Sequence, residues 1–252
     1  MTLLRVENLA KRFDGIHAVD EVSFGVEEKE IFSIIGPNGA GKTTIFNLIS
    51  RIYPASGGRI LFDGQDVTRL APASVARVGI ARTFQNIELF EQATVLDNLL
   101  IGRHCRNETG FLAEALRLPA FCRSEVAHRR KAEEVIEFLG IERHRKSPVA
   151  ALPYGTRKIV ELGRALCAEP RLLLLDEPSS GLNPEEAEEI GYWIEDIRNL
   201  LGITVLIIEH NMALVSSVSD RVLALSYGRV LALGACDAVR AHPDVATAYL
   251  GT

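Results

Sequence analysis

The sequence predicts an α/β fold in which a helical segment is inserted into a core of short buried strands. Three apolar runs have the length of strands: Ile31–Ile35, Leu172–Leu175 and Thr204–Ile208. Continuous hydrophobicity over such short runs is typical of parallel strands that are covered on both faces. Between the first run and the other two, residues 87–168 contain few strand patterns and carry apolar residues at helical spacing. We therefore expect helices there.

Two segments near the N-terminus predict a small antiparallel sheet beside this core. Residues 22–26 alternate apolar residues with polar or small ones, which is the pattern of a half-buried strand. Residues 59–62 form a second strand-like segment that runs into Asp63-Gly64, a dipeptide typical of hairpin turns. We expect a single domain over residues 1–252. Residues 1–86 and 169–252 form its core and the β subdomain, and residues 87–168 form its helical subdomain.

The composition narrows the class of protein. The chain has 252 residues with 28 Lys and Arg against 33 Asp and Glu, a formal net charge of −5. This balance argues against bulk nucleic-acid binding, which needs a basic surface. No apolar run approaches the roughly 18 residues of a membrane span, and the first residues lack the features of a signal peptide. Four scattered cysteines fit reduced thiols in the cytosol.

A phosphate-binding loop follows the first strand. Residues 36–43 fit the pattern G-x-x-x-x-G-K-[ST], and a helix can begin directly after them. Glycines let backbone N–H groups wrap phosphate oxygens, and the helix N-terminus presents a positive end to the same anion. Lys42 is expected to reach the β- and γ-phosphates, and the Thr43 hydroxyl to ligate Mg²⁺. The expected nucleotide-binding residues here are Gly36, Pro37, Asn38, Gly39, Ala40, Gly41, Lys42, Thr43 and Thr44.

Two acids end the second buried strand. Asp176 and Glu177 follow Leu172–Leu175, and successive side chains of a strand diverge, so the two carboxylates can do different jobs. Asp176 is expected to hold Mg²⁺ through its water shell, and Glu177 to orient and deprotonate an attacking water. The alternative is an acidic cap before a helix that spans residues 184–197.

With these motifs in place, the sequence resembles the ATP-binding subunits of ABC transporters along nearly its whole length. Phe13 stands where that family places the aromatic residue that stacks on adenine, and Val19 is its expected apolar neighbour. Gln85 matches the loop glutamine that takes part in catalysis and binds Mg²⁺ in that family. His210 matches the switch histidine that follows a strand. The resemblance thus implies Glu177, His210 and Gln85 as catalytic residues, with ATP and Mg²⁺ as cofactors.

The signature segment of the family corresponds to Leu152–Thr156, and Ser179–Asn183 matches the loop that crosses the dimer interface. The resemblance implies that Tyr154, Gly155 and Thr156 contact nucleotide. The usual signature reads Leu-Ser-Gly-Gly-Gln, so Pro153 and Tyr154 replace its serine and first glycine. Pro153 has neither a hydroxyl nor an N–H group to donate to a γ-phosphate. It can, however, begin the helix that follows. We expect an altered but retained contact.

The resemblance implies a homo- or heterodimer with a second ABC ATPase. Two ATP molecules lie between each phosphate loop and the opposing signature segment; ATP binding closes the dimer and hydrolysis resets it. The dimer drives two integral-membrane permeases and indirectly serves a periplasmic or extracellular solute-binding protein, with no nucleic acid involved. The expected location is peripheral, on the cytoplasmic face of the plasma (inner) membrane. Leu89 and Phe90 are candidate permease contacts, with packing inside the helical subdomain as the alternative.

Within that superfamily the sequence is most similar to branched-chain amino acid importers. Five segments carry this likeness: Arg82–Asn86, Leu152–Gly155, Gly181–Pro184, Glu209–Met212 and Ala248–Thr252. The function expected is therefore ATP hydrolysis coupled to uptake of branched-chain or other hydrophobic amino acids. Importers of urea or short amides and exporters of lipopolysaccharide are the alternatives. A single phosphate loop and the lack of sustained heptads disfavour a soluble ATPase outside transport, and the retained catalytic residues disfavour a regulatory module without turnover.

Overall fold

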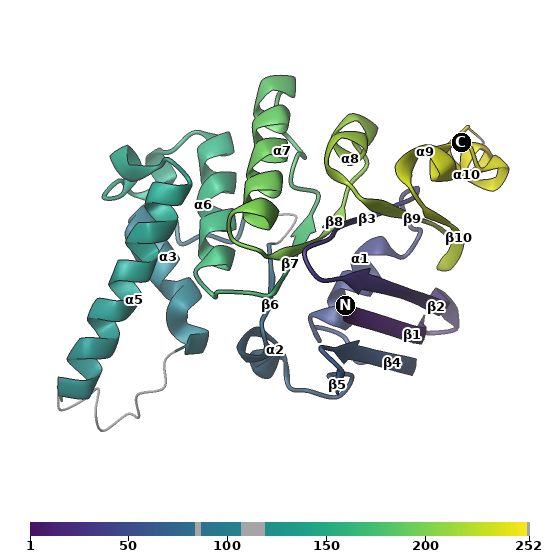
Figure 1. The fold of residues 1–252 in the computed structure, drawn as a ribbon, viewed down its shortest axis with the longest axis horizontal. Coiled ribbons are helices and arrows are strands. Elements are labelled where there is room, and N and C mark those ends of the chain that lie inside the picture. The colour runs from purple at the N-terminus through teal and green to yellow at the C-terminus, as the bar shows by residue number, and fades with distance from the viewer. Residues whose placement is uncertain (84–86, 107–118, 251–252) are drawn as a thin grey trace.

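The computed structural model describes residues 1–83, 87–106 and 119–250, in which two sheets form the framework (Figure 1). The larger sheet has the strand order β10-β9-β3-β8-β7-β6, and the smaller has the order β2-β1-β4-β5. The larger sheet consists of β3 (Ile31–Ile35), β6 (Ile80–Arg82), β7 (Leu172–Asp176), β8 (Thr204–Ile208), β9 (Arg221–Ser226) and β10 (Arg229–Gly234). The smaller consists of β1 (Thr2–Phe13), β2 (Ile16–Glu27), β4 (Gly57–Phe62) and β5 (Gln65–Asp66).

The three predicted parallel strands are confirmed as the centre of the larger sheet. Strand β8 pairs in parallel with β3 on one side and with β7 on the other, and every residue of all three is buried. Their side chains alternate between two apolar clusters, so that Phe32 and Leu174 face one layer while Leu173 and Val205 face the other. Burial on both faces explains why these segments read as continuous apolar runs.

The predicted antiparallel sheet is also confirmed. Strand β1 pairs antiparallel with both β2 and β4, and Val22, Phe24 and Val26 are buried while Ser23 between them is exposed. The sequence did not identify β6, which is three residues long, or the β9–β10 hairpin at the opposite edge of the larger sheet. Three residues are too few to establish a period in β6, whereas β9 and β10, with six residues each, are long enough and were missed.

Helices cover both faces of the larger sheet (Figure 1). The helix that follows the phosphate loop packs in one apolar cluster with both sheets through Ile45 and Phe46, while helices from the second half of the chain cover the opposite face. The helices are α1 (Lys42–Ile49), α2 (Pro72–Val78), α3 (Val95–Gly102), α5 (Pro119–Phe138), α6 (Tyr154–Leu166), α7 (Pro184–Asn199), α8 (Met212–Val218), α9 (Cys236–Arg240) and α10 (Pro243–Leu250). Single 3₁₀ turns span Arg103–Arg106, Glu142–His144 and Val149–Ala151.

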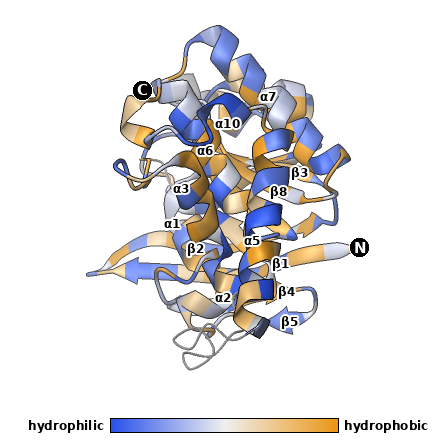
Figure 2. Ribbon diagram, turned by 90° about the vertical axis from the view of Figure 1, so that its left-hand side faces the viewer, coloured by the Kyte–Doolittle hydropathy of each residue, from blue (hydrophilic) through white to orange (hydrophobic). Residues whose placement is uncertain are grey.

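The expected helices of the inserted segment are present as α3, α5 and α6, which lie between β6 and β7 in the chain. Their inner residues, among them Leu99, Ile136 and Val160, join strand residues such as Leu173 in one buried cluster. Surface helices such as α5 and α7 alternate hydrophobic and hydrophilic residues along their length (Figure 2). No helix in the described part of the chain is both long and apolar enough to cross a membrane.

The register of the central strands brings three loops to one edge of the sheet. Ile208 pairs with Ile34 on one side and with Asp176 on the other. Because these strands are parallel, the residues that follow them leave the sheet side by side. The phosphate loop, Glu177 and Glu209 therefore lie together at the carboxyl end of the central strands.

Candidate active site

The phosphate loop is pressed against neighbouring backbone, which explains its glycines. Gly36 has a φ of 151° and Gly41 a φ of 98°. A Cβ atom at Gly36 would lie 2.3 Å from the carbonyl oxygen of Leu225, and one at Gly41 would lie 2.3 Å from that of Ala18. Gly41 is also the N-cap of α1, and no side chain caps that helix. The first N–H groups of α1 therefore remain available to an anion held in the loop.

Lys42 is buried within the loop. Its side chain donates hydrogen bonds to the carbonyl oxygens of Gly36 at 2.7 Å and Pro37 at 3.0 Å. Burial lowers the pKa of Lys42, while the negative charges of Glu177 and Asp176 oppose that shift. The two acids act on Lys42 because all three groups stand at the same end of the sheet. The site thus combines a cation and a helix N-terminus, which suit the phosphates of a nucleoside triphosphate, with two carboxylates, which suit its metal ion and an attacking water.

Asp176 is held by an ion pair and keeps one oxygen unused. Its Oδ2 accepts a hydrogen bond from Nη2 of Arg82 at 2.7 Å, and both side chains are buried. Arg82 also donates to Asn47 on α1 and to Ser50 at its C-cap, so it fixes Asp176 relative to the helix of the phosphate loop. Asp176 Oδ1 is buried and has no hydrogen-bond partner among the described residues.

A buried acceptor without a donor is costly, so Oδ1 fits a ligand that brings one. A water molecule in the shell of Mg²⁺ meets this need, since Mg²⁺ keeps several waters and prefers oxygen ligands. The hydroxyl of Thr43, exposed in the first turn of α1, supplies a second oxygen of suitable chemistry. These residues therefore fit the metal that the sequence predicts.

Glu177 and His210 lie at the mouth of this site. Glu177 has a φ of 51°, an uncommon value for a residue other than glycine, and its N–H donates to the carbonyl of Ile208 at 2.9 Å. Its side chain is largely buried, and its Oε2 lies 3.9 Å from Nδ1 of His210. The His210 side chain is 59% exposed, which leaves its ring accessible from solvent. The structure thus brings together the predicted base and the predicted switch histidine.

Glu209 is a site residue whose role sequence reasoning missed. Its side chain is fully buried; Oε1 accepts the N–H of Ser179 at 2.8 Å, and Oε2 accepts those of His210 at 2.9 Å and Asn211 at 3.1 Å. One carboxylate thus ties the loop after β7 to the loop after β8. The available signal was a charged residue directly after a buried strand.

The signature segment begins α6, as predicted. Pro153 occupies the N-cap, with a φ of −56°, and Tyr154 is the first helical residue. The Tyr154 ring packs over Gly181, where an added Cβ would lie 3.1 Å from its Cε1. The backbone of Gly155 lies against Glu186, which closes a capping box with Asn183 at the start of α7. The start of α6 is therefore packed on the loop after β7 of the same chain.

The remaining predicted residues differ in accessibility. Phe13 is 39% exposed, and its ring meets Tyr53 edge-on at a centroid distance of 5.4 Å. Val19 is fully buried in the cluster between the sheets, so it supports the strand beneath the loop and presents no surface to a base. Thr44 and Thr156 are partly exposed. The prediction for Gln85 falls outside the described residues.

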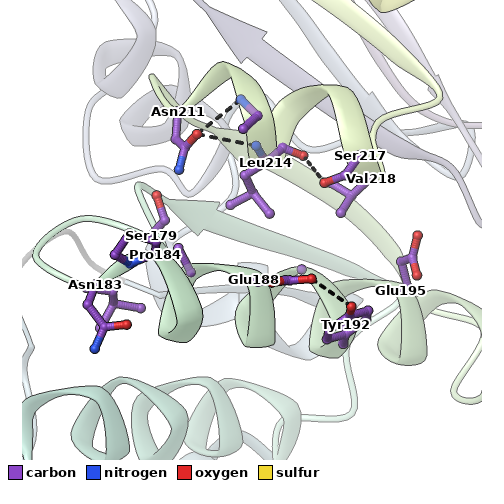
Figure 3. A pocket seen from close by; sticks show the side chains of 14 residues that line it. Ser179, Asn183, Pro184, Glu188, Tyr192, Glu195, Asn211, Leu214, Ser217 and Val218 are labelled. Atoms are coloured by element: carbon purple, nitrogen blue, oxygen red, sulfur yellow. Dashed lines mark hydrogen bonds between the residues drawn. The ribbon is translucent and has the colours of Figure 1, made fainter.

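A groove of about 520 Å³ lies beside the site, between α7 and α8 (Figure 3). Asn211 caps α8 there by accepting the N–H groups of Ala213 and Leu214. Tyr192 is 60% exposed at the groove and donates to Glu188, whereas neighbouring Trp193 packs against Phe138. The helical period of this segment does not tell which of the two aromatic residues is covered. Lys42, Asp176 and Glu177 do not line this groove.

Comparison with known proteins assigns the family. Residues 19–180 match the family described as ABC transporter. The chain is 41% identical over 249 residues to the high-affinity branched-chain amino acid transport ATP-binding protein BraF of Pseudomonas aeruginosa, covering 99% of this chain and 98% of the relative. It is 40% identical, with the same coverage, to the protein LivG of Escherichia coli. A solved ATP-binding cassette of an ABC transporter in its ADP conformation is 35% identical, covers 100% of both chains and has a TM-score of 0.88.

The fold and these matches define a phosphate-loop ATPase of the cassette type. The chain belongs to the ABC transporter family, and within it the chain is the subunit that hydrolyses ATP.

Replacing Lys42 by Ala should weaken nucleotide binding. The variant loses the only cation that the described residues place inside the phosphate loop, and a charge-assisted hydrogen bond contributes roughly 1.5–3 kcal/mol, or about ten- to hundredfold in affinity. Titration calorimetry with ATP measures the effect, with the exposed Lys146→Ala as control. Equal affinities for both variants would contradict the assignment.

Replacing Glu209 by Ala should destabilise the fold because three N–H groups, one buried and two partly buried, lose their acceptor. A broken buried network of this kind costs on the order of 3–5 kcal/mol in the free energy of unfolding. Urea unfolding measures it. Glu209→Gln, which keeps one carbonyl oxygen, should fall between the variant and the natural protein. A loss below about 1 kcal/mol in Glu209→Ala would show that the loops hold each other without this carboxylate.

Proposed function

We propose that this ATPase subunit drives an importer of branched-chain or other hydrophobic amino acids. The observation that carries the proposal is likeness over almost the entire chain to two proteins named for branched-chain amino acid transport, at 40–41% identity. The likeness includes the whole chain from the first strand to the last helix rather than the nucleotide site alone. The subunit is then peripheral to the cytoplasmic face of the plasma (inner) membrane, where it meets two integral-membrane permeases and indirectly serves an external solute-binding protein.

The residues of the site suit ATP hydrolysis. The phosphate loop holds the phosphates, with Lys42 at the β- and γ-phosphates. Thr43, Asp176 and Gln85 would hold Mg²⁺, which would neutralise charge on the phosphates. Glu177 is largely buried, its Oε2 lies 3.9 Å from Nδ1 of His210, and it takes the proton of the attacking water. His210 holds that water and the γ-phosphate in place. Phe13, the exposed aromatic at the end of β1, stacks on adenine.

The working unit is a dimer of this subunit with a second copy or a related ATPase. Tyr154, Gly155 and Thr156 stand at the accessible start of α6 and face ATP held by the partner. With Pro153 unable to donate a hydrogen bond, the N–H of Gly155 and the positive end of α6 supply this contact. ATP favours the closed dimer because the contact exists only there.

Leu89 and Phe90 have different surroundings: Leu89 fits packing inside the helical segment, and Phe90 fits contact with a permease. Leu89 is partly buried against the apolar cluster of the helical segment. Phe90 is 58% exposed, yet its backbone is fixed, because the buried side chain of Asn98 accepts its N–H at 2.8 Å and donates to its carbonyl at 3.0 Å. An exposed aromatic on a fixed backbone suits a contact with another protein. We assign the permease contact to Phe90.

Replacing Glu177 by Gln should leave ATP binding intact and reduce hydrolysis at least about a hundredfold, because the amide keeps the shape and removes the base. Dimers that form on addition of ATP should then accumulate, as gel filtration can show. Comparable turnover of the variant and the natural protein would remove Glu177 from this role.

Replacing Phe90 by Ala should lower transport in proteoliposomes while the isolated subunit keeps its ATPase activity and melting temperature, since the side chain leaves solvent only on docking. Leu89→Ala is the matched control, and it should lose stability instead. Normal transport by Phe90→Ala would place the permease contact elsewhere.

Purification of the subunit from membranes with its permeases, followed by uptake assays, tests the solute. ATP-driven uptake of labelled leucine or valine supports the proposal. Uptake of urea or short amides alone, or co-purification with lipopolysaccharide-export components, would overturn the assignment of substrate.

A further inference from the structure

Lys158 joins the signature helix to the backbone that carries the catalytic acid. It lies in the second turn of α6 and is 8% exposed. Its Nζ donates to two consecutive main-chain carbonyls, those of Glu177 and Pro178, each at 3.2 Å. None of the roles assigned above for ATP or Mg²⁺ uses this residue. A buried ammonium directed at the backbone of an active-site residue therefore needs another explanation.

The charges around Lys158 come from several elements. Burial lowers its pKa, and the carboxylates of Glu161 on α6, Glu209 after β8 and Glu177 after β7 oppose that shift. Its ammonium also stands 5.7 Å from the ring centroid of Tyr154 one turn earlier. Thus a single cation is in electrostatic contact with the signature segment, with the catalytic acid and with the carboxylate that fixes the histidine loop.

Lys158 contacts a stretch of backbone that has an uncommon conformation. Glu177 has a φ of 51°, outside the regions that such residues favour. Its carbonyl accepts the N–H of Ser180 at 3.1 Å as well as the Lys158 ammonium. Among the described residues, Lys158 alone donates to the carbonyl of Pro178. Without Lys158, the carbonyl of Glu177 would keep its bond from Ser180 and the carbonyl of Pro178 would lose its donor, so the backbone that follows Glu177 would be held less firmly.

The start of α6 also rests on the loop after β7, through Tyr154 over Gly181 and Gly155 beside Glu186. Any shift of the signature segment therefore carries Lys158 with it, because both belong to the same rigid helix. Tyr154 is connected to the main-chain carbonyl of Glu177 through one turn of α6 and one hydrogen bond from Lys158.

We propose that Lys158 is a positioning residue that orients Glu177 for hydrolysis and reports the position of the signature helix to the catalytic acid of the same subunit. This rests on the proposed role of Glu177 as base. In the dimer, the signature segment of one subunit contacts the ATP that the partner's phosphate loop holds. Through Lys158, that contact would influence Glu177, which acts on the ATP held by the subunit's own phosphate loop.

The test replaces Lys158 by Met, which keeps the linear apolar stem and removes the donor. We expect kcat for ATP to fall about ten- to hundredfold, as for a displaced catalytic group, with KM changed less than about twofold. ATP binding and ATP-driven dimerisation, both measured on a Glu177→Gln background, should be unchanged, since that background separates assembly from chemistry. Lys158→Arg, which keeps a buried cation able to reach the carbonyls, should recover at least part of kcat. The control is Lys146→Met, which replaces an exposed lysine of the inserted segment outside α6 and should behave as the natural protein.

The outcomes separate the possibilities. A purely structural role would lower the melting temperature, kcat and dimerisation together, would not be rescued by Arg, and would overturn the proposal. Normal kcat in Lys158→Met, with Glu177→Gln inactive, would overturn the proposal and leave the function of Glu177 standing. Normal turnover in Glu177→Gln would instead remove the base on which the proposal rests.

Discussion

The register of three parallel strands is the constraint on which the site depends. Ile34, Ile208 and Asp176 stand side by side in β3, β8 and β7, so the phosphate loop, Glu209 and Glu177 leave the sheet at one edge. A shift of one residue in any pairing would turn the side chains of that strand to the opposite apolar layer, where they would not fit the side chains packed there. Core packing therefore fixes the positions of the polar groups, although none of them belongs to the core.

The same edge concentrates buried charge, and each charge is held by a partner of defined geometry. Lys42 donates to the loop that it closes, Asp176 accepts from Arg82, Glu209 accepts three N–H groups, and Lys158 donates to two carbonyls. Buried charges are tolerated only when paired in this way. The pairs join the three loops to α1, to β6 and to α6. The site is thus one connected network, and displacement of one element reaches the others through a hydrogen bond.

The parts of the fold that the sequence predicts are those with local signals. The three buried strands, the phosphate loop, the hairpin turn after β4 and the start of α6 each show in a few consecutive residues. The partners of the buried charges do not, because Arg82 and Asp176 are 94 residues apart and Lys158 and Glu177 are 19 apart. Exposure is equally non-local: Tyr192 lies at an open groove, and Val19, expected beside Phe13 at the adenine, is fully buried. These features depend on which elements meet, and no local pattern carries that information.

A crystal structure of Glu177→Gln with ATP and Mg²⁺ tests the roles of Lys42 and Asp176 most directly. We expect Lys42 Nζ within hydrogen-bonding distance of the β- and γ-phosphates. We also expect Asp176 Oδ1, which lacks a partner among the described residues, to accept a water bound to Mg²⁺ while Oδ2 keeps its bond to Arg82. Phosphates bound away from Lys42, or a metal ion held without Asp176, would contradict these roles.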